Sequence, residues 1–162
     1  MSMPLSIIVA MTDDRVIGAN GRVPWSIPGE MKLFKELTVG NTVIMGRSTW
    51  DSLPERFRPL PNRINIVVST TMGQQDGITV CRTIEEAIEK THNYSKEVFS
   101  IGGAQIYAAT LPLADTLHIS WIRKKYEGDT YFPKIDLDRW TITETKEADE
   151  FTYKKYLRKN QG

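Results

Sequence analysis

The sequence predicts an α/β fold: a single domain with a mixed, mostly parallel central sheet of about eight strands, flanked by about four helices. Strand and helix patterns alternate through the first two-thirds of the chain, as right-handed crossovers between parallel strands require. The last third adds strands without helices, and Trp140–Thr145 and Phe151–Leu157 show the partial alternation of an antiparallel pair. No repeat or linker divides the chain, so we expect one domain over residues 1–162.

Composition and charge exclude several classes of protein. The chain has 162 residues, of which 40% are hydrophobic and 25% charged, as is typical of a globular protein. A net charge of +1 argues against nucleic-acid binding by bulk charge. No apolar run reaches the roughly 18 residues of a membrane span, and no signal peptide is recognisable. Cys81 is the single cysteine, which favours a reducing compartment, and no cluster of metal ligands is present.

The first elements are a buried strand, a long loop and a helix. Leu5 to Met11 is an apolar run broken only by Ser6, which is typical of a strand buried on both faces of a sheet. Thr12 to Pro24 contains turn residues, and a loop of more than about ten residues is often functional, with a solvated surface loop as the alternative. Pro28 suits the first turn of a helix that runs to Thr38.

Glu30 lies on an unexpected face of that helix. On a helical wheel it falls beside Phe34 and Leu37, at the edge of the apolar stripe. A carboxylate there costs free energy unless a cation or hydrogen-bond donors meet it, or unless its pKa rises until it holds a proton. An acidic residue that complements the helix dipole is the alternative, but it explains the position along the helix and not the face.

Two later strands each end in glycine and pass directly into a helix. Thr42–Met45 is followed by Gly46-Arg47-Ser48-Thr49, and Val98–Ile101 is followed by Gly102-Gly103. The first turn of such a helix exposes backbone N–H groups, which attract phosphate. Arg47 and the two hydroxyls add further phosphate-binding chemistry. A purely structural turn is the alternative for either one alone.

The remaining elements complete the sheet. In chain order they are a Pro/Arg-rich connector over Pro54–Pro61, a strand at Ile64–Val68 followed by Ser69-Thr70, a strand at Ile78–Val80 followed by Arg82, a helix opened by the capping box of Thr83 and Glu86, a strand at Thr116–Ile122 and a loop at Glu127–Pro133.

Four of the strand ends carry anion-binding chemistry. They are Gly46–Thr49, Ser69-Thr70, Arg82 and Gly102-Gly103, and parallel sheets bind ligands beyond the carboxyl ends of their strands. A lone arginine such as Arg82 is usually a surface residue, but four such ends on one rim favour a ligand with several phosphates. A dinucleotide with an extra 2′-phosphate fits this layout, without the Rossmann fingerprint G-x-G-x-x-G.

The sequence also resembles the dihydrofolate reductase family, in motifs that run in family order across nearly the whole chain. These motifs are Asp14-Arg15-Val16-Ile17-Gly18, Val23-Pro24-Trp25, Val43-Ile44-Met45-Gly46-Arg47 with Thr49-Trp50, Arg58-Pro59-Leu60-Pro61-Asn62-Arg63, Ile101-Gly102-Gly103 with Ile106-Tyr107, and Glu127-Gly128-Asp129-Thr130.

This resemblance implies a dihydrofolate-reductase-like fold and the reduction of 7,8-dihydrofolate to tetrahydrofolate with hydride from NADPH, in support of one-carbon and thymidylate metabolism. It implies dihydrofolate and antifolates as small-molecule ligands, with no metal, nucleic-acid or membrane partner. We expect a monomer in the cytoplasm.

The resemblance also implies the residues of the site. Glu30 would orient the pteridine and help to deliver a proton to N5. The implied catalytic residues are Glu30, Trp25, Tyr107 and Ser120. The implied substrate-binding residues are Val9, Glu30, Met31, Phe34, Leu53, Leu60, Arg63 and Ile101, with Arg63 pairing with the α-carboxylate of the glutamate tail. The implied cofactor-binding residues are Ala10, Ile17, Gly18, Gly46, Arg47, Ser48, Thr49, Ser69, Thr70, Arg82, Gly102, Gly103, Ala104, Gln105 and Tyr107.

Two backbone features are implied as well. The loop from Gly18 to Trp25 would close over the nicotinamide, and the peptide between Gly102 and Gly103 would be cis. The sequence departs from common family patterns at three places. Ser120 stands where threonine is usual, Gln105 replaces an arginine, and the connector Leu53–Arg58 is longer. Arg47, Arg82 and Thr70 are then left to bind the 2′-phosphate.

Three other interpretations remain open. A pyrimidine reductase of the riboflavin pathway would share the fold, but Glu30 and Arg63 suit a pterin and a carboxylate tail. A nucleotide-binding regulator without catalysis would bind NADPH without oxidising it. In the third, the glycines and arginines of a globular domain are purely structural.

Overall fold

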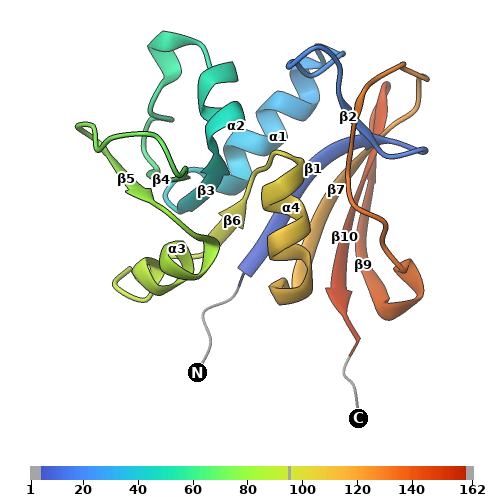
Figure 1. Cartoon of the computed structure of the whole chain (residues 1–162). Helices are drawn as coiled ribbons and strands as arrows, with labels where there is room; N and C mark the ends of the chain where they lie inside the picture. The colour runs from blue at the N-terminus through green and yellow to red at the C-terminus, as the bar shows by residue number, and fades with distance from the viewer. Residues whose placement is uncertain (1–4, 95, 160–162) are drawn as a thin grey trace.

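The structure, a computed structural model, describes residues 5–94 and 96–159. Its main sheet has eight strands in the order β5-β4-β3-β6-β1-β7-β10-β9 (Figure 1). The strands are β1 (Leu5–Thr12), β2 (Val16–Gly18), β3 (Thr42–Gly46), β4 (Ile64–Val68), β5 (Ile78–Cys81), β6 (Val98–Ser100), β7 (Thr116–Ile122), β8 (Thr130–Tyr131), β9 (Trp140–Glu147) and β10 (Phe151–Arg158). The α-helices are α1 (Pro28–Thr38), α2 (Arg47–Ser52), α3 (Ile84–Thr91) and α4 (Ala104–Thr110), with 3-10 turns at Glu55–Phe57, Leu111–Leu113 and Leu137–Arg139.

The sheet is parallel from β5 to β7, and β10 pairs antiparallel with both β7 and β9. This confirms the predicted mixed, mostly parallel sheet with antiparallel C-terminal strands. The chain leaves β1, skips one position to β3, continues outward to β5 and returns to place β6 between β3 and β1. The carboxyl ends of these five strands therefore lie on one rim of the sheet.

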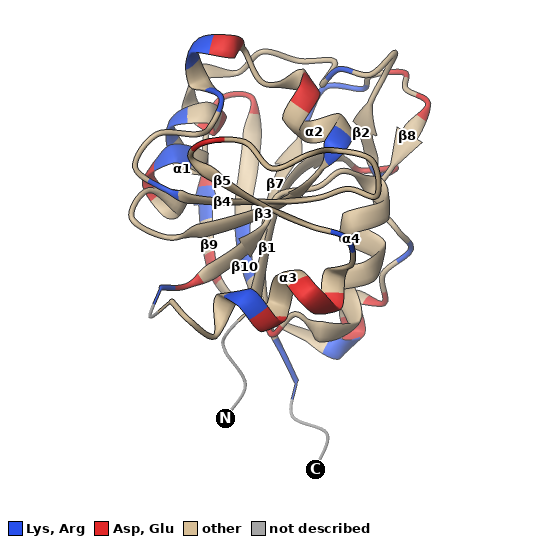
Figure 2. Ribbon diagram, turned by 60° about the vertical axis from the view of Figure 1, so that its left-hand side comes forward, with Lys and Arg blue, Asp and Glu red and all other residues tan. Residues whose placement is uncertain are grey.

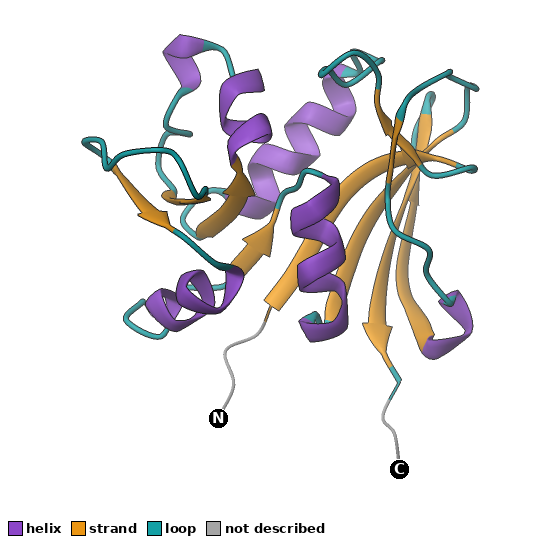
Figure 3. Cartoon of the chain, in the orientation of Figure 1, coloured by secondary structure: helices purple, strands orange, loops and turns teal. Residues whose placement is uncertain are grey.

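Helices cover both faces of the sheet, as Figure 3 shows. Strand β3 demonstrates the layering, because all three of its central apolar residues are fully buried. Val43 and Met45 pack in a core with Phe34 and Leu37 of α1, whereas Ile44 packs with residues of α3 and α4 on the opposite face. A strand covered on both faces needs a continuous apolar run, which is the pattern seen in the sequence.

The predicted loops at residues 12–24 and 127–133 each contain a short strand, which the sequence analysis missed. Strands β2 and β8 pair antiparallel. The backbone N–H of Asp129 donates to the carbonyl of Gly18 at 3.0 Å, and its carboxylate accepts from the N–H of Asn20 at 3.0 Å. Strands of two or three residues are too short for a detectable alternation, so only the pairing reveals them.

The two glycine turns lie against each other. The N–H of Gly46 donates to the carbonyl of Gly102 at 2.8 Å. The peptide between Gly102 and Gly103 is cis, as the family resemblance implied. Gly102 has a φ of +101°, and a Cβ at this position would lie 2.7 Å from the ring of Tyr107. Only glycine fits this turn, for reasons of backbone conformation and of space.

Strand β7 carries a buried histidine. His118 on β7 is 4% exposed, and its Nδ1 lies 2.7 Å from the hydroxyl of Tyr153 on β10. Its Nε2 has no partner among the described residues. If the Tyr153 hydroxyl donates to Nδ1, the one group left unsatisfied is the Nε2–H donor. In the other tautomer Nδ1–H donates to the hydroxyl, and both the Nε2 lone pair and the hydroxyl hydrogen are left unsatisfied. We therefore assign the proton of the neutral ring to Nε2. Burial and the charge of Lys155 lower the pKa of His118 to about 4.

We predict that His118 makes the fold sensitive to acid. The unfolded chain takes up a proton near pH 6.5, but the folded ring stays neutral until about pH 4. The contribution of the neutral ring to the free energy of unfolding is therefore fully present above pH 6.5 and is lost as the pH falls toward 4. Denaturant unfolding measures the free energy of unfolding, which should fall between pH 7 and pH 4.5. This fall should be about 2 kcal/mol smaller in His118→Gln than in the wild type. The exposed His92→Gln is the control, and an equal loss in all three proteins would contradict the prediction.

We also predict that Gly102→Ala destabilises the protein by about 1–3 kcal/mol, because the new Cβ meets a ring that cannot retreat. The hydroxyl of Tyr107 is held by the carbonyl of Ile8 at 2.9 Å. Urea unfolding measures the effect. Gly73→Ala is the matched control, since a Cβ there meets nothing within 4 Å. Equal stability of the two variants would show that the turn accommodates a side chain.

Candidate active site

Two cavities open along the carboxyl rim of the sheet. The smaller one has a volume of about 200 Å³ and lies between β1, α1 and the glycine turn after β6. The larger one has a volume of about 870 Å³ and extends past the starts of α2 and α4 toward β4 and β5. Gly103 lines both cavities. A long ligand with one apolar end and one phosphorylated end could therefore occupy both.

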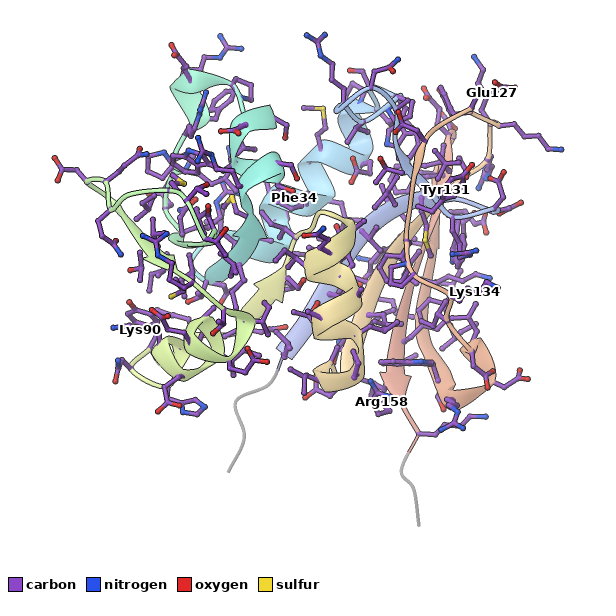
Figure 4. The ribbon with its side chains drawn as sticks, viewed as in Figure 1. Phe34, Lys90, Glu127, Tyr131, Lys134 and Arg158 are labelled. Atoms are coloured by element: carbon purple, nitrogen blue, oxygen red, sulfur yellow. The ribbon has the colours of Figure 1, made fainter. Side chains whose placement is uncertain are left out.

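The smaller cavity is mostly apolar, and Glu30 is its one carboxylate. Ten of its lining residues were expected at the site from the sequence: Val9, Ala10, Ile17, Trp25, Glu30, Phe34, Thr49, Ile101, Gly103 and Tyr107. Phe34, labelled in Figure 4, reaches the cavity from α1. These residues come from β1, the loop at 12–24, α1 and α4, so only the tertiary fold brings them together.

Glu30 has the environment that its position on the helix predicted. The side chain is half-buried at the cavity wall, and no ion pair to it occurs among the described residues. Desolvation disfavours the charged form and raises the pKa of Glu30 to about 7. A carboxyl group with this pKa holds a proton near neutral pH and can also release it, which suits an acid–base role.

The other three predicted catalytic residues are all buried, but only two of them line the small cavity with Glu30. Trp25 is buried at the wall of the small cavity, and its Nε1 has no partner among the described residues, so it can donate to a ligand or to water. Its ring packs edge-on against the ring of Tyr126, and the two ring centroids are 5.4 Å apart. Tyr107 is buried, and desolvation together with the charge of Glu30 raises its pKa. Ser120 is buried on β7, beside Ala10 of β1, and is not part of the cavity wall.

Arg63 lies past the end of α1, outside the small cavity. Its Nη1 donates to Oγ1 of Thr38 at 3.0 Å, its Nε donates to the carbonyl of Pro61 at 2.9 Å, and the guanidinium lies 6.0 Å from the ring centroid of Phe34. Partial burial lowers its pKa from the ordinary value, but an arginine remains charged. Nη2 makes none of these bonds, so it is available to an anion.

Three predicted substrate-wall residues also lie outside the cavity lining. Leu60 is buried in the core beneath it, and Leu53 is half-buried against the same core. Met31 is 60% exposed. The helix turns this side chain toward solvent rather than toward the sheet, so Met31 is not part of the core.

The larger cavity contains most of the predicted phosphate-binding groups. Those that line it are Gly46, Arg47, Ser48, Ser69, Thr70, Arg82, Gly103 and Gln105. Gly18, Gly102 and Ala104 are not among its lining residues. Gly102 instead forms the turn beneath Gly103, and Gly18 joins the loop at 12–24 to Asp129.

Two of these groups have a structural task that the sequence did not reveal. Nη1 of Arg82 donates to the carbonyls of Ser69 and Met72 at 2.7 and 2.6 Å. Oγ of Ser69 accepts from the N–H groups of Thr71 and Met72 at 3.2 and 3.0 Å. Arg82 thus closes the turn after β4 through Nη1, and the same residue lines the larger cavity.

The residues of the larger cavity fit a phosphorylated dinucleotide. Arg47 and Arg82 supply cations, and Ser48 and Thr70 supply hydroxyls, within one continuous space. The close approach of the two glycine turns leaves no room for a side chain, since a Cβ on Gly46 would lie 3.0 Å from Ile106. Backbone groups are consequently accessible where the two cavities meet.

Several lining residues were not assigned to the site from the sequence. They include Val23 and Ser52 at the small cavity, and Asp51 and Glu85 at the large one. Asp51 follows Arg47 by one helical turn, so the spacing alone could have placed it beside the cation. Val23 lies in the segment from Gly18 to Trp25, which the resemblance implied would close over the nicotinamide. No signal in the sequence indicated Ser52 or Glu85.

Other kinds of site find little support in the described part of the chain. It contains no group of three or more His, Cys, Asp or Glu residues that could hold a metal ion. None of its helices is long and apolar enough to cross a membrane.

Comparisons with known proteins agree with the geometry. Residues 4–159 match the family model described as dihydrofolate reductase. The chain is 37% identical to the dihydrofolate reductase of Haemophilus influenzae over 150 residues, which cover 91% of each protein. It is also 37% identical to that of Bacillus subtilis, over 89% of this chain and 84% of the relative. Identity with dihydrofolate reductase type A13 of Escherichia coli is 33%, over 98% and 97% of the two chains.

A solved structure resembles the whole fold. Dihydrofolate reductase from Enterococcus faecalis, complexed with NADP(H) and RAB-propyl, superimposes with a TM-score of 0.87 at 32% sequence identity and covers 97% of both chains. Sequence and fold therefore agree over almost the full length, and the chain belongs to the dihydrofolate reductase family.

Proposed function

We propose that this chain reduces 7,8-dihydrofolate to tetrahydrofolate, with NADPH as the hydride donor. The observation that carries the proposal is Glu30, a half-buried carboxyl group with a pKa near 7 in an apolar cavity that meets a phosphate-binding one. When bound, NADPH supplies the hydride for C6 of the pterin. The protein must then hold the two rings together, exclude water and deliver one proton to N5.

Glu30 is suited to both orienting and protonating the substrate. The amino and ring N–H groups of a pteridine are the donors that a semi-buried carboxyl group needs. Its proton would reach N5 through a water molecule held by the free Nε1 of Trp25. The hydroxyl of Ser120 would support this hydrogen-bond network. Serine keeps the hydroxyl of the usual threonine but leaves its rotamer less restricted.

The nicotinamide would lie over the glycine turn. Ala10, Ile17 and Tyr107 line the small cavity around Gly103, and the hydroxyl of Tyr107 is already bonded to Ile8, so its ring is a fixed wall. The segment from Gly18 to Trp25 would close over the ring and exclude water. Its bonds to Asp129 show how that segment is held in the described conformation.

The remaining assignments follow from charge. Arg63 would receive the α-carboxylate of the glutamate tail at its free Nη2, beyond Phe34. Arg47, Arg82 and Thr70 would receive the 2′-phosphate in the larger cavity. Antifolates that mimic the pteridine would compete at Glu30. We further propose a monomer with a single domain over residues 1–162, acting in the cytoplasm without nucleic-acid or membrane partners.

The pyrimidine reductase of the riboflavin pathway is the less favoured substrate assignment, because its substrate has no carboxylate tail for Arg63. The first test is the oxidation of NADPH by the purified protein with 7,8-dihydrofolate, followed by absorbance, with NADH in parallel. Turnover with dihydrofolate supports the proposal. Tight binding of NADPH without turnover would instead favour the pyrimidine reductase and then the non-catalytic regulator.

We predict that Glu30→Gln slows the chemical step near neutral pH and removes the transition near pH 7 that Glu30 gives to the rate. In the wild type, hydride transfer should fall as the pH rises through about 7, because the carboxyl group loses its proton there. The variant should be slower by about 10²- to 10⁴-fold at pH 7 and less impaired in acid, where the substrate arrives protonated. Single-turnover rates from pH 5 to 9 measure this effect, and a full rate at pH 7 would exclude Glu30 as the proton-handling group.

Unfolding of the same variant provides the control. Because the pKa of Glu30 is raised in the folded protein, ionisation of this group lowers the free energy of unfolding as the pH rises from 4.5 through about 7. Glu30→Gln should therefore be at least as stable as the wild type at pH 8, so a slow rate would not reflect unfolding.

We predict that Arg63→Ala weakens folate binding by about 1.5–3 kcal/mol, the range for a charge-assisted hydrogen bond, or roughly ten- to a hundredfold in Kd. Fluorescence titration with folate, and with a pterin that lacks the glutamate tail, measures the effect. Only folate should lose affinity. Arg139→Ala, an exposed arginine on the far 3-10 turn, is the control. An unchanged affinity for folate in Arg63→Ala would remove the tail-site assignment.

A further inference from the structure

The larger cavity has as many carboxylates as guanidinium groups. Its charged lining residues are Arg47, Arg82, Asp51 and Glu85, so their formal charges cancel. Gln105 contributes hydrogen-bonding groups but no charge. A phosphate monoester carries a charge of about −1.5 to −2 at neutral pH, and a cavity without net charge attracts it only through local contacts.

Neither guanidinium group is wholly free for a phosphate. Nε of Arg47 lies 3.3 Å from each carboxylate oxygen of Asp51, one turn further along α2. Figure 2 shows this short helix with both a basic and an acidic stretch. Nη1 of Arg82 is occupied by two backbone carbonyls. The carboxylate of Asp51 therefore lies beside the most available cation of the cavity.

We propose that Asp51 is a specificity-determining residue, whose negative charge lowers the preference for a dinucleotide with a 2′-phosphate over one without it. Glu85, on the opposite side of the cavity at the start of α3, acts in the same direction. The inference rests on the proposed function, since it assigns the larger cavity to the adenosine end of NADPH. It concerns the strength of the cofactor preference and not the reaction.

Asp51 has two opposing effects on Arg47. It accepts from Nε and so turns the Nη edge of the guanidinium outward, and it repels a phosphate that approaches this edge. An exposed pair one helical turn apart orients its partners only weakly, because water competes for both. The repulsion acts on both charges of the phosphate, so it should exceed the benefit from orientation. Asparagine separates the two effects, because its amide oxygen still accepts from Nε but carries no charge.

The test compares Asp51→Asn with Asp138→Asn, an exposed acidic residue on the 3-10 turn at Leu137–Arg139, outside both cavities. Kd values for NADPH and for NADH are measured by quenching of tryptophan fluorescence, and kcat/KM with 7,8-dihydrofolate is measured for each. Asp51→Asn should lower the NADPH-to-NADH ratio of Kd and raise the NADPH-to-NADH ratio of kcat/KM, each about two- to fivefold at low ionic strength and less at high salt. The affinity for NADH and the Asp138→Asn values should not change.

Arg47→Gln distinguishes failure of this inference from failure of the site assignment. A preference for NADPH over NADH that is unchanged or lowered in Asp51→Asn, with NADPH binding weakened in Arg47→Gln, would overturn the role of Asp51 and leave the cavity assignment intact. A preference for NADPH that is unchanged in both variants would overturn the cavity assignment and the inference together. Turnover of dihydrofolate in the wild type tests the reaction independently of either result.

Discussion

The position of β6 between β1 and β3 is the constraint on which the site depends. The N–H of Gly46 bonds to the carbonyl of Gly102, so the turns after β3 and β6 lie against each other and the helices that follow them start at the same place. A side chain on Gly102 would collide with Tyr107. The two cavities meet at Gly103 because these turns contain no side chains to separate them.

The charged groups of the two cavities differ in their exposure to solvent, and therefore in their chemistry. In the small apolar cavity, desolvation raises the pKa of Glu30 and prepares it to hold a proton near pH 7. In the large cavity, Arg47 and Asp51 are about half exposed, at 48% and 53% of their side chains, so their charges are screened by water. One rim of the sheet thus offers a protonatable group to one end of a ligand and balanced, screened charges to the other.

Local sequence signals were sufficient where one element alone determines the structure. The apolar run of β3 predicted a strand buried on both faces. The wheel position of Glu30 predicted a carboxyl group that meets a cation or donors or has a raised pKa, and the structure shows the raised pKa. They were insufficient for β2 and β8, whose two or three residues become strands only by pairing across more than a hundred positions of the chain. Local signals also did not show that Met31 is exposed, because a helical wheel describes a face but not the angle at which the helix meets the sheet.

The sequence by itself determined the family, the order of strands and helices, and the kinds of side chain at the carboxyl rim, because motifs, periodicity and glycine turns are local properties. Only the tertiary structure decided which of those side chains are free to bind. Nη1 of Arg82 is bonded to the carbonyls of Ser69 and Met72. Leu60 lies in the core, and Asp51 and Glu85 line the larger cavity. These outcomes depend on contacts between segments far apart in the chain, and a pattern of residue types carries no record of distance between them.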